Sequence, residues 1–431
     1  MNDYDGIAKK CVEIAKKSSS QTYGVGAIVH NGNDVIIEAN NSVYQDGTIK
    51  DSSAHAEIQA IRKQEQLAKT DKSLDFTKTE LTTSMCPCMM CTGALLRLAR
   101  GNNNGNGYRQ IRFVAPNETV NFPIQNELLP RELQKPAMSI AQFNEHSQNP
   151  ELVEQASSAF YKSRDRIRTE LIKDSRKWNS CIGYNGETLR ELNSVNKHAL
   201  SVTINQNILN DIVESEVRTI AEQSFLSTGE RDAAILFDPE GKELFRSGSK
   251  TNESILATPI MNVITDYENW AFNAHKRGDI VPDFTDCTIV SLREPQLMEA
   301  GRLGFAAGKN KLRNNSLLYL TKDDRLGVES TGVINNLRQV SPNFGICNAL
   351  HYCETKFLDN QPEKYFMTKN EGNAGNIPEK IKPQIGMEWG DTFPDVFGDE
   401  SHFCDVVGKR EISPQSGHIK NKKGRILGEE P

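Results

Sequence analysis

The sequence contains no run of about 18 consecutive apolar residues, the length that a helix needs to cross a bilayer. Its first residues, MNDYDGIAKKC, have no apolar core of the kind found in a secretory signal. Cysteine is sparse, and the nine thiols, an odd and scattered set, do not form a disulfide framework. We therefore expect a cytoplasmic location and no membrane partner.

Two other features are missing. The glycine-rich run from Gly101 to Gly107 lacks the Lys-Ser/Thr pair of a phosphate-binding loop. Excess positive charge is also absent, since the net charge is −6. This charge argues against strong electrostatic affinity for nucleic acid, although it is compatible with a local basic face. The 431 residues suffice for two domains or slightly more.

The sequence does contain side chains that bind metals. His55 lies at the start of an apolar-periodic run, and Cys88 and Cys91 lie three residues apart in PCMMC. A catalytic zinc site uses about three nitrogen and sulfur ligands and keeps one position open for water. If a helix begins at Cys88, both sulfurs lie on one face of its first turn, where the helix end favours thiolate. We predict that His55, Cys88 and Cys91 bind Zn²⁺.

Glu57, two residues after His55, is placed to act on a metal-bound water. Zinc lowers the pKa of such a water toward about 7 to 9, and a neighbouring carboxylate can move its proton as a general base and acid. The alternative is a closed structural site with Cys86 as the fourth ligand. The short spacing between Cys86 and Cys88, and a carboxylate beside the histidine, favour the catalytic site.

H-x-E followed by P-C-x-x-C is the signature of zinc nucleobase deaminases. The segment from about Gly24 to Val114 resembles the cytidine and deoxycytidylate deaminase superfamily, in the branch of guanine, cytosine and tRNA adenosine deaminases. SSAHAEIQAIRK is similar to the guanine and tRNA deaminase helix, and MCTGAL to the fungal cytosine deaminase helix. The resemblance implies zinc binding by His55, Cys88 and Cys91, and proton transfer by Glu57.

Substrate contacts are implied by the same resemblance. Asn41 matches the family's substrate-contacting asparagine after the second strand, and the backbones of Ala56, Cys86 and Cys88 match residues that line the pocket. Cys86 departs from the family, because many relatives have Glu at this position. That departure affects recognition of the exocyclic amine rather than the reaction itself.

The expected elements indicate an α/β protein. They are a helix over 3–17, a hairpin around Asn31-Gly32, a helix over 54–68, a strand over 77–83, a helix over 88–100 and a strand over 110–115. This order predicts a three-layer α/β/α, cytidine-deaminase-like fold with a mixed sheet. The same order returns about 205 residues later, which predicts two tandem copies.

The second copy lacks the chemistry of the first. The residues aligned with His55, Glu57, Cys88 and Cys91 are Thr258, Ile260, Gln296 and Glu299. TPIM and REP in this copy resemble the inactive subunit of the eukaryotic tRNA adenosine deaminase, whereas an unrelated α/β domain is the alternative. Because superfamily members generally pair through helices beside the active site, we expect the copies to pair within the chain. Further dimerisation stays open.

We divide the chain into a catalytic zinc deaminase domain (1–145), a helical connector (146–225), a degenerate deaminase-like domain without zinc ligands (226–365) and an irregular C-terminal tail (366–431). The connector carries seven basic and three acidic side chains between Tyr161 and Lys177. Such a segment is either a solvated helix face or a phosphate-contacting surface.

The sequence favours hydrolytic deamination of a nucleobase, nucleoside or related small heterocycle, with release of ammonia. A small substrate is preferred over RNA because residues 1–120 are nearly neutral, with 14 Lys+Arg against 13 Asp+Glu. The alternatives are adenosine-to-inosine deamination of tRNA, with the second copy holding the RNA, and a non-catalytic zinc-stabilised scaffold. A riboflavin-type deaminase and reductase fusion is disfavoured, because the C-terminal half has no glycine-rich dinucleotide fingerprint.

Overall fold

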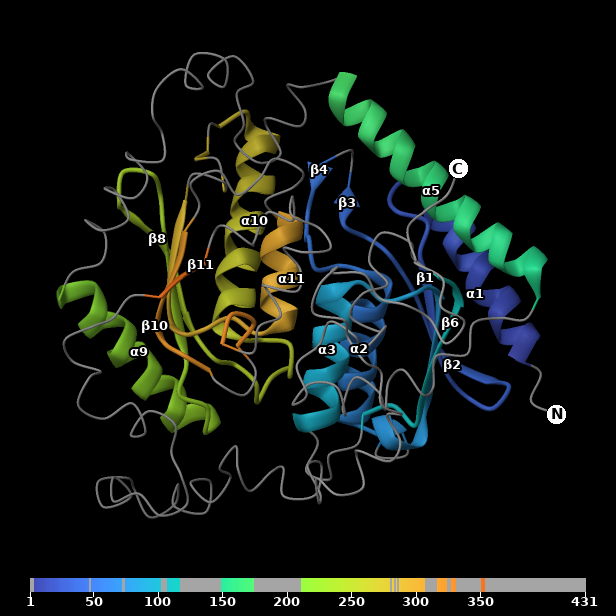
Figure 1. Ribbon diagram of the computed structural model, residues 1–431, viewed down its shortest axis with the longest axis horizontal. Coiled ribbons are helices and arrows are strands. Elements are labelled where there is room, and N and C mark those ends of the chain that lie inside the picture. Colours follow the sequence, from blue (N-terminus) through green and yellow to red (C-terminus); the bar gives the residue numbers. More distant parts are fainter. Residues whose placement is uncertain are drawn as a thin grey trace, which may run out of the picture. The chain divides into compact units, whose positions relative to one another are not determined.

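Two α/β subdomains follow each other along the chain (Figure 1). The computed structural model describes residues 4–45, 48–71, 74–101, 107–116, 149–173, 211–279, 281–282, 284, 287–306, 316–323, 327–330 and 350–352. These residues all belong to one unit, Met1–Thr392. The tail predicted over 366–431 lies outside the described residues.

The N-terminal subdomain contains a four-stranded sheet. Its elements are α1 (Tyr4–Ser18), β1 (Gly26–Asn31), β2 (Asp34–Asn40), β3 (Tyr44–Gln45), β4 (Thr48–Ile49), α2 (Ala56–Ala68), the 3-10 helix η2 (Phe76–Lys78), β5 (Glu80–Met85), α3 (Met89–Gly101), β6 (Gln110–Ala115) and α5 (Pro150–Lys173). The sheet order is β2-β1-β5-β6, in which β5 and β6 are parallel and the other pairs antiparallel. The predicted mixed sheet is therefore confirmed.

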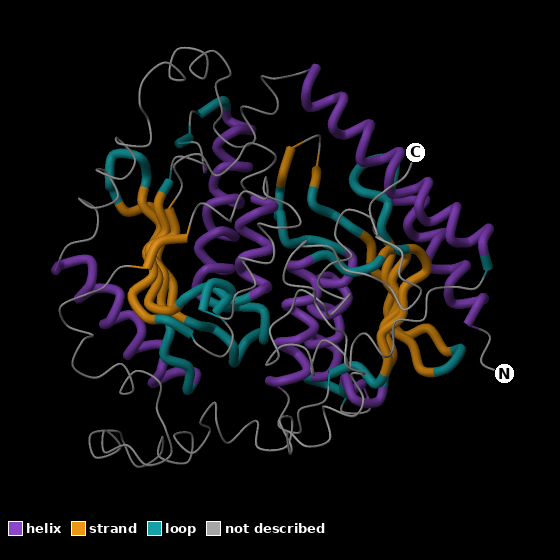
Figure 2. The backbone as a smooth tube through the Cα atoms, in the orientation of Figure 1, coloured by secondary structure: helices purple, strands orange, loops and turns teal. Residues whose placement is uncertain are grey.

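Burial explains this arrangement. The central strand β5 is buried along its whole length, whereas the edge strand β2 alternates between exposed and buried positions. Gly32 closes the β1–β2 hairpin with a φ of 59°, which glycine adopts without strain. Figures 1 and 2 show α1 and α5 on one face of the sheet and α2 and α3 on the other, which is the predicted three-layer order.

The C-terminal subdomain repeats this plan with one more strand. Its elements are α9 (Asp211–Thr228), β7 (Ala233–Phe237), β8 (Glu243–Gly248), α10 (Pro259–Arg277), β9 (Thr288–Arg293), α11 (Leu297–Ala306), β10 (Ser316–Thr321) and β11 (Leu350–Tyr352). The sheet order is β11-β10-β9-β7-β8. The sequence analysis did not predict β11, a strand of three residues that pairs in parallel with β10.

The two sheets have the same strand order and directions apart from β11. Strands β8, β7, β9 and β10 correspond to β2, β1, β5 and β6, with two antiparallel pairs followed by a parallel pair. Helix α9 packs on the C-terminal sheet as α1 packs on the N-terminal one. The helical connector expected over 146–225 therefore ends in a helix that belongs structurally to the C-terminal subdomain.

Helices α3 and α11 cross in direct backbone contact. A Cβ atom on Gly93 would lie 2.2 Å from the backbone nitrogen of Met298, and one on Gly301 would lie 2.4 Å from that of Met90. The contact is reciprocal, because each glycine meets the same position of the other helix. Glycine at both positions permits this approach, and the N-terminal ends of the two helices are thereby held together.

Candidate metal centre

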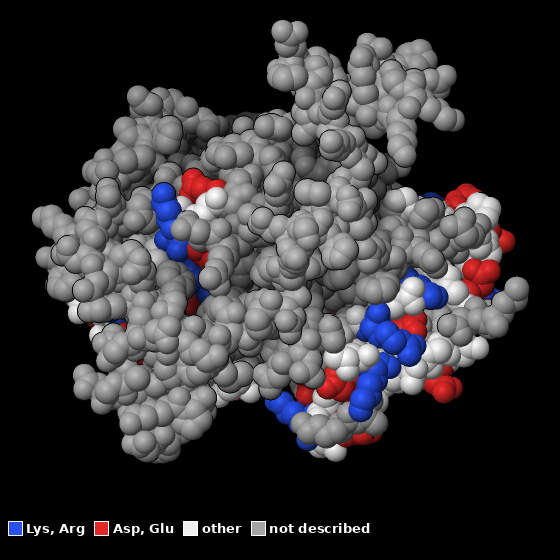
Figure 3. Space-filling view, turned by 60° about the horizontal axis from the view of Figure 1, so that its bottom comes forward, with Lys and Arg blue, Asp and Glu red and all other residues white. Residues whose placement is uncertain are grey.

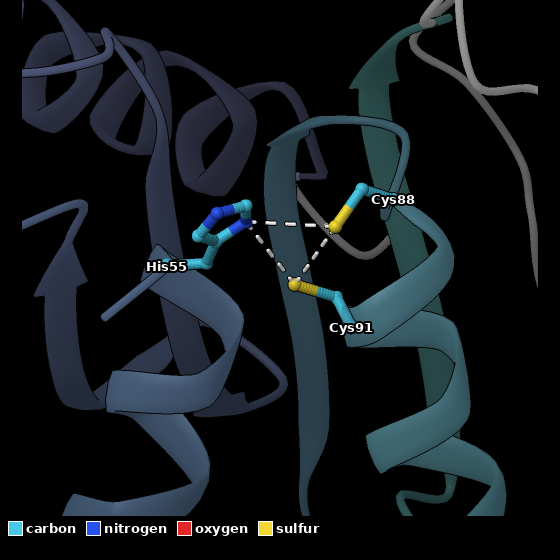
Figure 4. A group of neighbouring side chains, drawn as sticks. All are labelled: His55, Cys88 and Cys91. Atoms are coloured by element: carbon cyan, nitrogen blue, oxygen red, sulfur yellow. Dashed lines mark hydrogen bonds between the residues drawn. The ribbon is translucent and has the colours of Figure 1, made fainter. Parts of the chain in front are cut away.

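The ends of two helices bring the predicted ligands together. His55 is the N-cap residue of α2, with an extended backbone (φ −69°, ψ 156°), so its side chain projects beyond the helix. Cys88 immediately precedes α3, and Cys91 lies in the first turn of that helix. In Figure 4 the three side chains point toward one another from the starts of α2 and α3.

The distances between the donor atoms fit one tetrahedral metal. His55 Nδ1 lies 3.5 Å from Cys88 Sγ and 3.6 Å from Cys91 Sγ, and the two sulfurs are 3.5 Å apart. Tetrahedral zinc bonds of about 2.0–2.1 Å to nitrogen and 2.3 Å to sulfur separate the donors by about 3.5 to 3.8 Å. His55, Cys88 and Cys91 therefore meet the geometric requirement for three ligands of a zinc ion.

Electrostatics also favours a metal ligand set. The pKa of Cys88 is lowered well below its usual value by the hydrogen bond between Cys88 and Cys91 and by the nearby His55 ring, although burial opposes this shift. Burial raises the pKa of Cys91, and the Cys88 charge adds to that rise. Burial alone would lower the pKa of His55, but Cys88 and nearby carboxylates produce a net rise. Cys88 is thus the readier thiolate, which is the form that binds metal.

Glu57 lies buried beside this group. Its side chain is 3% exposed, and its Oε2 atom has no hydrogen-bond partner in the part of the chain that the structure describes. Burial, with the charge of Cys88, raises the pKa of Glu57 to about 7. A buried carboxyl with an uncommitted oxygen next to three metal-binding atoms fits the role predicted for it.

Two residues predicted to contact substrate, Asn41 and Ala56, are buried, and Asn41 already makes hydrogen bonds within the protein. Asn41 is buried, and its Oδ1 accepts hydrogen bonds from Thr22 Oγ1 at 2.5 Å and from Val43 N at 3.2 Å. Ala56 is the fully buried first residue of α2. Whether either residue touches substrate stays a prediction.

Cys86 lies outside the group of donor atoms. Its Sγ approaches the Pro87 carbonyl at 3.9 Å, and its side chain packs on Phe113. Its backbone N–H donates a hydrogen bond to Ala115 O at 2.9 Å. The group that could hold a metal consists of His55, Cys88 and Cys91 among the described residues, which does not support a four-ligand structural site.

The sequence analysis missed Asp51, which organises the loop leading to His55. Its carboxylate accepts hydrogen bonds from Ser53 N and Ser53 Oγ, and pairs with Arg62 at 2.8 Å. Burial opposes ionisation, yet Arg302 and Arg62 hold the pKa of Asp51 well below its usual range. An Asp two residues before a Ser, just ahead of a helix, is a turn signal that the sequence did offer.

The C-terminal subdomain has a different set of side chains at the corresponding positions. Thr258 is the N-cap of α10, with nearly the backbone angles of His55 (φ −76°, ψ 158°). Glu299 Oε2 accepts a 2.6 Å hydrogen bond from Gln296 N, and Gln296 Nε2 donates to Asp323 at 3.1 Å. No metal-binding group of three or more side chains occurs in the described part of this subdomain.

One family model matches the segment that holds the candidate metal site. Residues 1–102 match the family model for the cytidine and deoxycytidylate deaminase zinc-binding region. A solved structure from a study of A-to-I editing by tRNA:A34 deaminases at the wobble position of transfer RNA is 21% identical, covers 32% of this chain and 89% of that chain, and has a TM-score of 0.24. None of the curated proteins compared with the chain matches it.

Among the described residues, no helix combines the length and apolar character required to span a membrane. The matched segment contains all three donor residues, His55, Cys88 and Cys91. Residues 1–102 are therefore similar to the zinc-binding region of cytidine and deoxycytidylate deaminases, which agrees with the resemblance of their motifs.

Proposed function

We propose that the chain is a zinc-dependent hydrolytic deaminase that removes an exocyclic amino group from a nucleobase, nucleoside or related small heterocycle. The observation that carries this proposal is the convergence of His55, Cys88 and Cys91 with buried Glu57 beside them. Zinc bound by these ligands would supply an activated water. Glu57 would take a proton at Oε2 and deliver it to the departing amine.

Other residues would orient the substrate. The Asn41 amide nitrogen is positioned to donate a hydrogen bond, because its oxygen is held by Thr22 and Val43. Ala56 at the start of α2 and the carbonyl of Cys86 would form part of the wall. Burial of Glu57 and Ala56 keeps bulk water from the proton that Glu57 carries.

A small substrate agrees with the charges that the structure describes. Basic side chains lie beside acidic ones in the described part of the face shown in Figure 3. A groove of about 580 Å³ between α1 and α5 is lined by Lys16, Lys162 and Arg166 but also by Glu151 and Glu154. Of the basic segment predicted in the connector, only the first part, in α5, is among the residues with described side chains. Mixed charges of this kind provide little of the attraction on which RNA binding depends.

The C-terminal subdomain is, in this proposal, a degenerate copy that no longer reacts. The matching sheet order, the equivalent N-cap residues His55 and Thr258 and the reciprocal glycine contacts support it. Glu294, at the position of Cys86, has its carboxylate held by the backbone nitrogens of Asp323, Glu329 and Ser330. These hydrogen bonds occupy the Glu294 carboxylate, so it has little capacity left to accept a hydrogen bond from a substrate amine.

The test is an ammonia-release screen of the zinc-loaded full chain. Guanine, adenine and cytosine, their nucleosides and nucleotides, and tRNA are the substrates. We expect release from one of the small molecules, its loss in Glu57→Gln with zinc retained, and normal release in Glu13→Gln, which changes an exposed carboxylate on α1. Release from tRNA alone would establish the RNA alternative. Zinc binding without release from any substrate would establish the scaffold.

A further inference from the structure

The two subdomains exchange a matched pair of hydrogen bonds. Glu268 Oε2 in α10 accepts from Ser52 N of the N-terminal subdomain at 2.8 Å. Glu65 Oε1 in α2 accepts from Ile255 N of the C-terminal subdomain, also at 2.8 Å. Each glutamate lies in the helix that follows the N-cap His55 or Thr258, and each accepts from the loop that precedes the other N-cap. The contacts are therefore related by the same two-fold pairing as the glycines.

One side chain breaks this symmetry. Arg302 in α11 is fully buried, whereas Ala94 occupies the equivalent position of α3, one residue after the paired glycine. The guanidinium has five N–H donors. Their acceptors are Ser52 Oγ (3.3 Å), Met261 O (3.0 Å), Thr265 Oγ1 (2.8 Å), Asp51 Oδ1 (3.3 Å) and Glu268 Oε2 (2.9 Å). All five donors are thus engaged, and two of them bind the loop of the other subdomain.

That loop leads directly to a predicted metal ligand. Asp51 Oδ1 also accepts from Ser53 N at 2.8 Å, and Ser53 O accepts from His55 N at 2.7 Å. Arg302 and Glu268, which belong to the C-terminal subdomain, hold the Asp51–Ser53 loop of the N-terminal subdomain. This loop in turn fixes the backbone of His55. The equivalent contact of Glu65 holds Ile255. The loop at Ile255 leads to Thr258, which is not a predicted metal ligand.

We propose that Glu268 and Arg302 are positioning residues for metal binding, by which the C-terminal subdomain sets the place of His55. The inference rests on the proposed metal site but not on turnover. A ligand held in place before the metal arrives binds it more tightly, because less conformational entropy is lost. Residues that orient a metal ligand typically change metal affinity by about 10–100-fold when they are replaced.

The test compares Glu268→Ala with Glu65→Ala in the full chain. Each variant removes a carboxylate that accepts a loop N–H across the same interface. Zinc affinity is measured by competition with a chelator, and the visible absorption of the cobalt(II)-substituted protein reports ligand geometry. We expect Glu268→Ala to lower zinc affinity by about tenfold and to alter the cobalt spectrum. Glu65→Ala should leave both unchanged while losing thermal stability.

Several outcomes would overturn the proposal. Wild-type zinc affinity and cobalt spectrum in Glu268→Ala would show that the loop needs no support, and equal losses in both variants would show a merely structural role. Should Glu268→Ala fail to fold, Glu268→Gln and Arg302→Lys decide on the same two measurements. Failure of the wild-type chain to bind zinc or cobalt would instead refute the proposed function itself.

Discussion

Replacing Gly301 by alanine should destabilise the protein, even though alanine is the better helix former. The residue lies inside α11, where helix propensity alone would stabilise the variant by about 1 kcal/mol. The new Cβ would lie 2.4 Å from Met90 N and 2.6 Å from Met90 Cα, which are backbone atoms that a side-chain rotation cannot move. Overpacking of this kind costs about 3 kcal/mol at the upper end of its usual range. We expect a net loss of about 2 kcal/mol.

Denaturant unfolding of the full chain measures this change. The midpoint should fall in Gly301→Ala and in Gly93→Ala, because each glycine meets the backbone of the opposite helix. The two losses should not add in the double variant, since both act on one helix crossing. Gln66→Ala, an exposed substitution on α2, should stay within about 0.5 kcal/mol of wild type. A higher midpoint in Gly301→Ala would refute the close approach of α3 and α11.

Three further predictions concern the metal site and the buried charges. Cys86→Ser should keep the zinc content of the wild type, because Cys86 Sγ faces Pro87 and Phe113. Cys91→Ser should lower the zinc content. Elemental analysis measures both, and zinc loss in Cys86→Ser would favour the four-ligand site. A strong chelator should lower the melting temperature of the zinc-loaded protein, since a metal that binds only the folded state stabilises it; an unchanged temperature would contradict zinc binding. Burial, with the charges of Glu230 and Glu299 and against that of Arg293, raises the pKa of Asp232 to about 7. The folded state then keeps a proton that the unfolded chain releases near pH 4, so stability should fall as pH rises from about 4 to about 7, by at most about 1.4 kcal/mol per pH unit. Asp232→Asn should remove this slope in unfolding measurements at several pH values, and an unaltered slope would contradict the assignment.

The candidate metal ligands could be predicted from the sequence because their placement is largely local. The spacing of Cys88 and Cys91 is set by one helical turn, and His55 and Glu57 by one helix start. The hairpin at Gly32 and the element order follow from turn residues and apolar periodicity in the same way. The strand β11 could not be predicted, because three residues carry no periodic signal of their own and pair through β10.

The sequence by itself determined which candidate ligands lie together and the α/β order of both subdomains, since these depend largely on neighbours within a few residues. Only the tertiary structure decided which distant side chains contact the loop before His55. Arg302 lies 250 residues from Ser52 in the chain, and Glu268 lies 216 residues from it. No local periodicity connects such positions. Their contacts exist because Gly93 and Gly301 let two helices meet at the backbone, which carries one subdomain to the loop before His55 in the other.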